Sequence, residues 1–282
     1  MALYQLEDPG KLLAPALLVA FEGWVSAGSA GTATIDHLAG DAPAIATFDS
    51  DRLYDYRANR PVADYFEGVL TDLSFPEVTL RRRRIGDRDL LMLSGIEPNW
   101  NWQQLGAEVA DLAQRLGVIE HVSLGGIPWA APHTRPTSIV ETASSPDHLS
   151  PDADHPEGRL RVPAAAVSIV ERAMIGHGLP TFGFWARVPH YVGTTYSPAV
   201  VALVERVSTH LGVTVPSGEL LDQAAEQRRV LDELIEDQPQ ARAVVEQLEA
   251  LVDEEGNVSG QELAAEIERF LADTTNDEGF ST

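Results

Sequence analysis

Short apolar segments alternate with amphipathic ones along residues 16–211 of the chain. An unbroken apolar run such as Ala16–Phe21 is typical of a strand buried on both faces of a sheet. Apolar residues at three- and four-residue steps predict helices, and Gly86-Asp87 between two apolar runs predicts a hairpin. The predicted strands are 16–21, 44–48, 78–85, 89–93, 118–124, 138–142 and 181–185, and the predicted helices are 29–38, 61–73, 102–116, 164–177 and 198–211. This alternation predicts an α/β fold with a layered, mostly parallel sheet.

After Pro216 the pattern becomes purely helical. Residues 219–235, 241–252 and 261–271 each repeat apolar side chains at helical spacing. Ser259 and Glu262 have the spacing of a capping box for the last of these helices. We therefore divide the chain into an α/β domain (1–215), an acidic helical appendage (216–273) and a tail (274–282) that we expect to be disordered.

The turn after the first predicted strand is rich in glycine. Gly23, Gly28 and Gly31 stand between that strand and the helix that follows it. Their spacing is not that of a dinucleotide fingerprint, and the Lys-Ser/Thr of a P-loop is absent. Two interpretations stay open. The glycines permit a tight turn and close packing, or the backbone N–H groups at the start of the helix bind an anion.

The net charge of −23 argues against nucleic acid and anionic membranes as partners. Much of this charge lies in residues 217–282, which hold 18 Asp and Glu against 4 Arg. No cysteine occurs, so disulfides and thiolate chemistry are excluded, and the cytoplasm is the expected compartment. We expect no signal peptide, no membrane-spanning segment, no bound metal and no cofactor.

Four consecutive arginines, Arg81–Arg84, fall on a predicted strand. Strand alternation sends two of them to each face, and buried arginines are costly without partners. We therefore expect this strand at an exposed edge of the sheet, where its charge discourages pairing with other sheets.

Polar and aromatic residues gather where the predicted strands end. In a parallel sheet these ends meet at one rim, which is where ligands bind. Glu97 and His133 are the candidates for acid/base catalysis. A small-molecule pocket and a purely structural role both remain open for this rim. The ligand or anion-binding candidates are Gly23, Trp24, Gly28, Asp49, Arg57, Arg60, Gly125, Gly126 and Arg135.

Several of these segments together resemble the PAC2 family, the relatives of proteasome assembly chaperone 2. The resemblance covers about residues 16–210, and the acidic helical C-terminus that follows is similar to that of the extended actinobacterial branch. The segments that carry it are Phe21-x-Gly23-Trp24-x-x-Ala27-Gly28, Phe48–Arg57 with Arg60-Pro61, Gly95-Ile96-Glu97-Pro98 with Trp102, and Gly125-Gly126 leading to Pro132-His133-Thr134-Arg135-Pro136.

The resemblance implies a three-layer α/β/α sandwich with a mostly parallel, mixed sheet, similar to the phosphorylase/hydrolase-like fold, plus the helical appendage. It also implies a cytoplasmic homo-oligomer, for which a trimer is the best single expectation. Characterised members assist assembly of the proteasome α-ring, and some dock through a C-terminal hydrophobic-Tyr-x tail. Ser281 stands at the position of that tyrosine, so docking by the tail is not expected here.

Three functions compete at this point. The first is a non-enzymatic assembly chaperone or scaffold, with protein-complex subunits such as proteasome components as partners. The second is an enzyme for a nucleoside or carboxylate, with Glu97 and His133 as acid/base and Arg60 and Arg135 holding an anion. The third is an oligomeric ligand-binding module without turnover. We favour the first, because no complete catalytic motif occurs.

Overall fold

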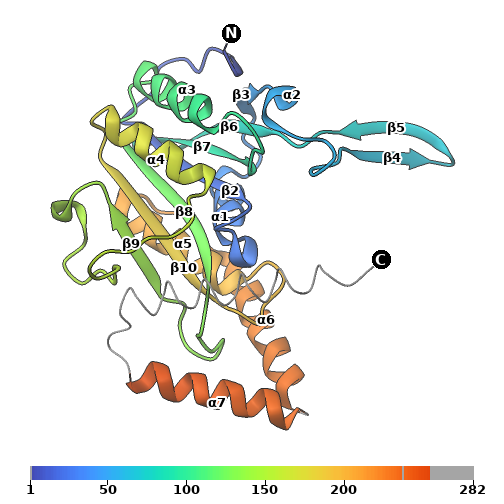
Figure 1. Ribbon diagram of the computed structural model, residues 1–282, viewed down its shortest axis with the longest axis vertical. Helices are drawn as coiled ribbons and strands as arrows, with labels where there is room; N and C mark the ends of the chain where they lie inside the picture. The colour runs from blue at the N-terminus through green and yellow to red at the C-terminus, as the bar shows by residue number, and fades with distance from the viewer. Residues whose placement is uncertain (1, 237, 255–282) are drawn as a thin grey trace.

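The computed structural model describes residues 2–236 and 238–254 (Figure 1). Its main sheet has eight strands in the spatial order β1-β3-β6-β7-β2-β8-β10-β9. The strands are β1 (Tyr4–Leu6), β2 (Ala16–Glu22), β3 (Ala44–Phe48), β6 (Val78–Ile85), β7 (Arg88–Ile96), β8 (Glu120–Trp129), β9 (Ile139–Ala143) and β10 (Thr181–Pro189). Strands β7, β2, β8 and β10 run parallel, while the strands outside them pair antiparallel. The prediction of a mostly parallel, mixed sheet is confirmed, and its parallel pairs join these four neighbouring strands.

Helices cover both faces of this sheet (Figure 1). One face packs on α3 (Trp102–Arg115) and α4 (Ala166–Gly176), and the other on α1 (Ala30–Ala39) and α5 (Ser197–Leu211). Alternate residues of β2 enter the two cores: Leu17 and Val19 lie in the first, Leu18 and Ala20 in the second. A strand buried on both faces has to be apolar at every position, which explains its unbroken apolar run. The fold is therefore the predicted three-layer α/β/α sandwich.

Two further helices follow the sandwich. Helix α6 (Gly218–Glu236) packs on α5, and α7 (Pro239–Glu254) follows it. They correspond to the helices predicted at 219–235 and 241–252. The helix predicted at 261–271 and the tail at 274–282 lie outside the described residues. No helix within residues 2–236 and 238–254 is both long and apolar enough to cross a bilayer.

The helix predicted at 61–73 is wrong. This segment forms a two-stranded hairpin, β4 (Val62–Phe66) and β5 (Val69–Ser74), which extends away from the sandwich (Figure 1). Its apolar residues have helical spacing by coincidence. The turn residues decide the outcome, because Glu67 (φ 49°) and Gly68 (φ 82°) both adopt the positive φ that a tight hairpin turn requires. The flanking valines and aromatic residues favour strands.

The expectation that Arg81–Arg84 lie on an edge strand is also wrong. Strand β6 lies between β3 and β7, although β3 pairs with it only as far as Arg81. As the alternation of side chains along a strand predicts, the four arginines are divided between the two faces of the sheet. Arg81 pairs with Asp36 of α1, and Arg83 donates to the carbonyl of Leu38 at 2.9 Å.

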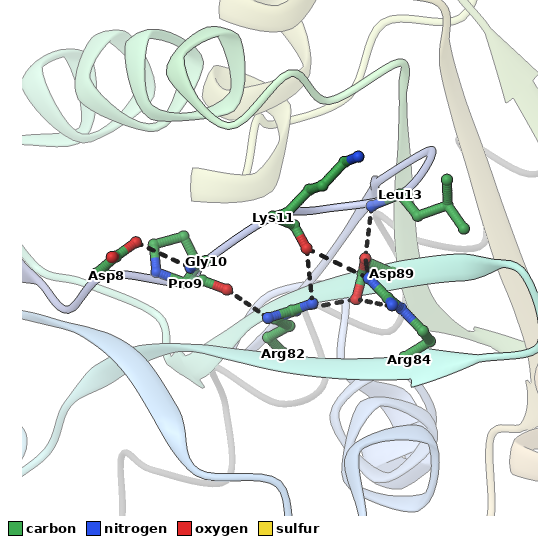
Figure 2. A network of polar contacts seen from close by, with 8 residues as sticks. All are labelled: Asp8, Pro9, Gly10, Lys11, Leu13, Arg82, Arg84 and Asp89. Carbon is green, nitrogen blue, oxygen red and sulfur yellow. Dashed lines mark hydrogen bonds and ion pairs between the residues drawn. The ribbon is translucent and has the colours of Figure 1, made fainter.

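Arg82 and Arg84 reach the opposite face and meet at Asp89 (Figure 2). The buried Asp89 carboxylate accepts from Arg82 Nε at 2.9 Å, Arg84 Nη2 at 2.6 Å and the backbone N–H of Leu13 at 2.7 Å. Burial alone would raise the pKa of Asp89, but these hydrogen bonds outweigh it and lower the pKa. The arginine run is thus tolerated on a strand that lies between two others, because every guanidinium has a partner and Arg83 and Arg84 stay exposed.

Short elements complete the fold. They were not predicted, since segments of three or four residues are too short to show a hydrophobic period. They are α2 (Ser50–Leu53), the edge strand β1 and the 3₁₀ turns η1 (Ala27–Ser29) and η2 (Pro146–His148).

Candidate functional site

The rim formed by the carboxyl ends of β2, β7 and β8 is held together by backbone contacts. The N–H of Trp24 donates to Glu97 Oε2 at 3.1 Å, and the N–H of Gly126 donates to the carbonyl of Val25 at 2.9 Å. Ser26 and Gly126 also form a parallel bridge. The outgoing loops of three strands therefore meet at one place, as the parallel sheet predicts.

Glu97 uses its carboxylate to join two loops. Besides the contact with Trp24, its Oε1 accepts from the N–H of Ala166 at 2.6 Å, at the start of α4. The positive end of a helix favours a carboxylate at this position. A Cβ at Gly23 would lie 2.4 Å from Glu97 Oε2, which explains the glycine there. Both oxygens of the predicted catalytic acid are thus engaged by backbone groups.

Gly125 and Gly126 allow the loop after β2 to lie directly on β8. A Cβ at Gly126 would lie 2.1 Å from the carbonyl oxygen of Ala27, and one at Gly125 would lie 2.6 Å from that of Val25. No side chain fits at such distances. Close packing therefore accounts for both glycines.

A hollow of about 260 Å³ opens at the same rim, beside the start of α1 and the end of β10. Gly28 lines it together with Glu22, Ser29 and His190. Glu22 accepts hydrogen bonds from the hydroxyls of Ser29 at 3.3 Å and Thr32 at 2.9 Å, so a carboxylate already faces the first turn of α1. No Lys or Arg is among the described lining residues. The hollow thus suits a neutral or cationic ligand better than the anion considered from sequence.

His133 is not among the residues that line this hollow, and it contacts the helical appendage. Its side chain is buried, with Nδ1 2.8 Å from the hydroxyl of Tyr191 and Nε2 3.2 Å from Asp232 of α6. Burial raises the pKa of Tyr191 to about 12, so the hydroxyl stays protonated at neutral pH. His133 and Glu97 have different hydrogen-bond partners, and no contact between them is present among the described residues.

The neighbours of His133 are held by acidic residues of α7. Arg135 pairs with Glu249 at 3.1 Å and with Asp253 at 2.7 Å, and Thr134 donates to Glu249. The hydrogen bond with Arg135 lowers the pKa of Asp253. We call these contacts of Asp232, Glu249 and Asp253 with the loop His133–Arg135 the clasp. The positive charge of Arg135 is therefore neutralised within the chain.

The remaining candidates lie before the hairpin rather than at the hollow. Asp49 immediately precedes α2, and its side chain makes no capping hydrogen bond. Arg57 and Arg60 are exposed, and neither guanidinium has a hydrogen-bond or ion-pair partner among the described residues. Trp24 is 40% exposed at the rim. The structure thus separates the predicted site into a rim, a clasp and a pair of exposed arginines.

Two features are absent from the site residues selected from the sequence. Glu22 and His190 line the hollow, and their position at or just after strand ends was a signal that could have selected them. The clasp had no local signal, since its partners lie about a hundred positions apart. Within the described residues, no group of three His, Cys, Asp or Glu is placed to bind a metal ion.

The motifs at the rim and in the loop at 132–136 indicate the same family as a comparison of the whole sequence with models of protein families. A model of the PAC2 family matches residues 20–235, more than half of the chain. The chain belongs to the PAC2 family. No curated protein matches it. The PAC2 match ends near the end of α6, so α7, which supplies Glu249 and Asp253 to the clasp, lies beyond it.

Several solved structures resemble the chain closely. A Mycobacterium tuberculosis protein of unknown function is 34% identical with a TM-score of 0.85, and the match covers 96% of both chains. A Corynebacterium glutamicum protein of unknown function is 31% identical with a TM-score of 0.83, covering 89% of this chain and 97% of that one. A Mycobacterium tuberculosis proteasome-assembly chaperone homologue is 32% identical with a TM-score of 0.74, covering 82% of this chain and 99% of that one. Nearly a fifth of this PAC2 chain therefore has no counterpart in the chaperone homologue.

Proposed function

We propose that the protein is a non-enzymatic assembly chaperone or scaffold that works as a cytoplasmic homo-oligomer, a trimer by our best expectation. The observation that carries the proposal is the 32% identity, over almost the full length of that relative, to a proteasome-assembly chaperone homologue. Proteasome subunits are accordingly the first partners to test.

The chemistry of the rim and of the clasp supports a scaffold rather than an enzyme. An acid/base catalyst needs a titratable group that a substrate can reach. Both oxygens of Glu97 accept backbone hydrogen bonds, and His133 is fully buried between Tyr191 and Asp232. Arg135 is neutralised by the clasp. These side chains stabilise the fold in the arrangement seen here.

The test is reconstitution with proteasome α-subunits from the source cell. The full chain is mixed with purified α-subunits, and complexes are followed by native mass spectrometry. We expect a defined complex with α-subunits and faster formation of α-rings. Unchanged assembly kinetics together with no complex would refute the proposal.

The hollow beside Gly28 supports a second candidate, a small-molecule site. It lies at the carboxyl ends of parallel strands, where ligands bind in open α/β sheets. Because Glu22 disfavours an anion, a nucleoside is the better candidate than a carboxylate. Titration calorimetry with nucleosides tests this, with Glu22→Gln as the site variant. No binding heat for any nucleoside would eliminate this candidate.

A further inference from the structure

A second hollow, of about 310 Å³, opens between α1 and the segment that joins the β4–β5 hairpin to β6. We call it the groove. Its wall contains the carboxylates of Glu22, Asp36 and Glu77, and no Lys or Arg is among its described lining residues. Glu22 also lines the hollow beside Gly28, whereas Asp36 and Glu77 do not. Neither candidate function uses these two acids.

The register of the sheet places Glu22 and Glu77 on the same face. Glu22 pairs with Ile96 of β7, and the register of β6 and β7, extended by one residue, places Glu77 beside Ile96 as well. Glu22 faces α1, since it accepts from the hydroxyl of Thr32. Val78 enters the core under α3 and α4, so Glu77, the residue before it, points to the opposite face, which α1 covers. Adjacent strands lie about 4.8 Å apart, so the backbones that carry Glu22 and Glu77 are separated by about 10 Å.

Two of the three carboxylates have no cation beside them. Arg81 pairs with Asp36. The partners of Glu22 are two hydroxyl groups, which carry no charge. Within the described residues, the exposed carboxylate of Glu77 has neither a hydrogen bond nor an ion pair. No three acids of the described part of the chain are placed to share a metal ion, so two separate organic cations match this arrangement better.

Apolar side chains flank the acids of the groove. Phe75 is 46% exposed and Ile96 is 38% exposed. The ring of Phe75 packs edge-on against Tyr56, with 5.3 Å between the ring centroids. The carbonyl of Ile96 accepts from the hydroxyl of Tyr54 at 2.6 Å, which fixes the backbone there. An apolar wall next to a carboxylate matches a side chain with an aliphatic stem and a cationic head, as in Arg and Lys.

The groove is open, because Glu22, Asp36 and Glu77 are all exposed. Small-molecule sites bury about 70–90% of their ligand, which an open groove does not provide. Extended peptides do bind in open grooves, and the polyproline II conformation suits this one. That helix has three residues per turn and rises about 3.1 Å per residue, so side chains three positions apart lie on one side, about 9 Å from each other. This spacing is close to that between the backbones of Glu22 and Glu77.

We propose that the groove binds an extended segment of a partner protein with two basic side chains three positions apart. One of them pairs with Glu22 and the other with Glu77, and their aliphatic stems lie against Phe75 and Ile96. This inference rests on the scaffold in the proposed function and gives the chemistry of a segment that the scaffold holds.

Fluorescence anisotropy with a labelled peptide tests the groove. The probe is Ala-Arg-Pro-Pro-Arg-Ala, and the isomer Ala-Arg-Arg-Pro-Pro-Ala has the same charge with a different spacing. We expect the full chain to bind the probe about fivefold more tightly than the isomer at low salt. Equal affinity for the two peptides, or a probe that does not bind, would overturn the proposal.

A pair of matched variants separates the groove from general attraction to an acidic chain. Glu77→Gln keeps the size of the side chain and removes its charge, and it should weaken binding of the probe about fivefold. The control is Asp87→Asn in the turn between β6 and β7, which is exposed, removes one charge as well and should leave binding unchanged. Both variants should keep the circular dichroism spectrum of the unmodified chain. Equal weakening in the two variants would count against the groove.

Spermidine distinguishes a free polyamine from a protein segment. Added as a competitor, it should displace the labelled probe only at a higher concentration than the unlabelled probe does. Displacement at the same or a lower concentration would assign the groove to a polyamine and refute a protein segment as its occupant.

These results also separate the groove from the wider proposal. If the probe does not bind while the chain still forms a complex with proteasome α-subunits, the groove is not a docking site and the assembly role stands. If the probe binds through Glu77 while no α-subunit does, the proteasome role is refuted and the groove remains the site of a different partner.

Discussion

The sequence suggests three arginines as anion-binding candidates: Arg135, Arg57 and Arg60. They differ in whether acidic side chains of the same chain pair with them. Arg135 is paired with Glu249 and Asp253 of its own chain, whereas Arg57 and Arg60 have no partner among the described residues. The rim and clasp are satisfied from within the chain. Within the described residues, the β4–β5 hairpin pairs only with itself, and the guanidinium groups of the arginines before it have no partner. Substitutions at the rim should therefore change stability, and substitutions at side chains without a partner should change binding.

The largest effect should come from Gly126→Ala at the rim. The added Cβ would lie 2.1 Å from a backbone oxygen that cannot move without breaking the bridge to β8. We expect a loss of about 3 kcal/mol or more in the free energy of unfolding, measured by urea denaturation. Gly176→Ala is the control, because nothing lies within 4 Å of its Cβ. Equal stability of the two variants would contradict the packing argument.

A smaller loss should follow Glu97→Ala. The substitution removes a carboxylate that accepts from the N–H groups of Trp24 and Ala166. Hydrogen bonds to charged groups contribute about 1.5–3 kcal/mol, so we expect a loss of about 2 kcal/mol. Asp64→Ala in the β4–β5 hairpin is the comparison, and it should not destabilise the monomer because it relieves the like-charge pair with Asp72. If Asp64→Ala destabilised the monomer as much as Glu97→Ala, the division between the rim and the hairpin would fail.

Glu171 on α4 predicts that the free energy of unfolding depends on pH. Burial raises the pKa of Glu171 on α4 from 4.5 to about 7, and a hydrogen bond with Ser123 of β8 opposes the shift. Between these two values the folded chain binds more protons than the unfolded chain, so this group's contribution to stability decreases as pH rises from about 4.5 through 7.

Glu171→Gln removes the ionisable group and keeps a polar side chain next to Ser123. We expect the variant to gain about 1–2 kcal/mol over wild type at pH 8 and almost nothing at pH 4. Thermal unfolding across this pH range measures the difference. A gain that is the same at both pH values would show that Glu171 does not titrate as described.

The smallest effect should come from the clasp. Arg135→Glu places a third carboxylate beside Glu249 and Asp253, which should release α7 with only a small change in the free energy of unfolding, since partly exposed ion pairs contribute little. Limited proteolysis should then cut within residues 239–254. Arg57→Glu is the matched charge reversal and should leave this region protected. Cleavage at the same rate in both variants would argue against the clasp.

The sequence predicts the sandwich well because its strands and helices have clear hydrophobic patterns. Ala16–Phe21 is apolar at each position because both of its faces are buried. The β4–β5 hairpin was misassigned because Val62, Tyr65, Phe66 and Val69 have helical spacing, while the deciding information lay in the two turn residues Glu67 and Gly68. The backbone conformation of the two turn residues, rather than the helical spacing of the apolar residues, decides the structure of this segment.

The site was less predictable than the fold. Strand ends identified the rim, since parallel strands bring Trp24, Glu97 and Gly126 together regardless of side-chain detail. Whether a charged side chain is paired depends on where its partner lies in the sequence. Arg82 and Arg84 find Asp89 on the adjacent strand, whereas Arg135 finds Asp253 across 118 positions. The first pairing follows from a hairpin, but nothing local predicts the second.

Hydrogen exchange of the unmodified chain, measured with and without the Ala-Arg-Pro-Pro-Arg-Ala peptide, tests the contrast between rim and groove most directly. We predict that the peptide slows the exchange of amides within residues 75–79, while amides of 120–129 stay equally protected with and without it. Exchange at 75–79 that does not depend on the peptide would contradict the account.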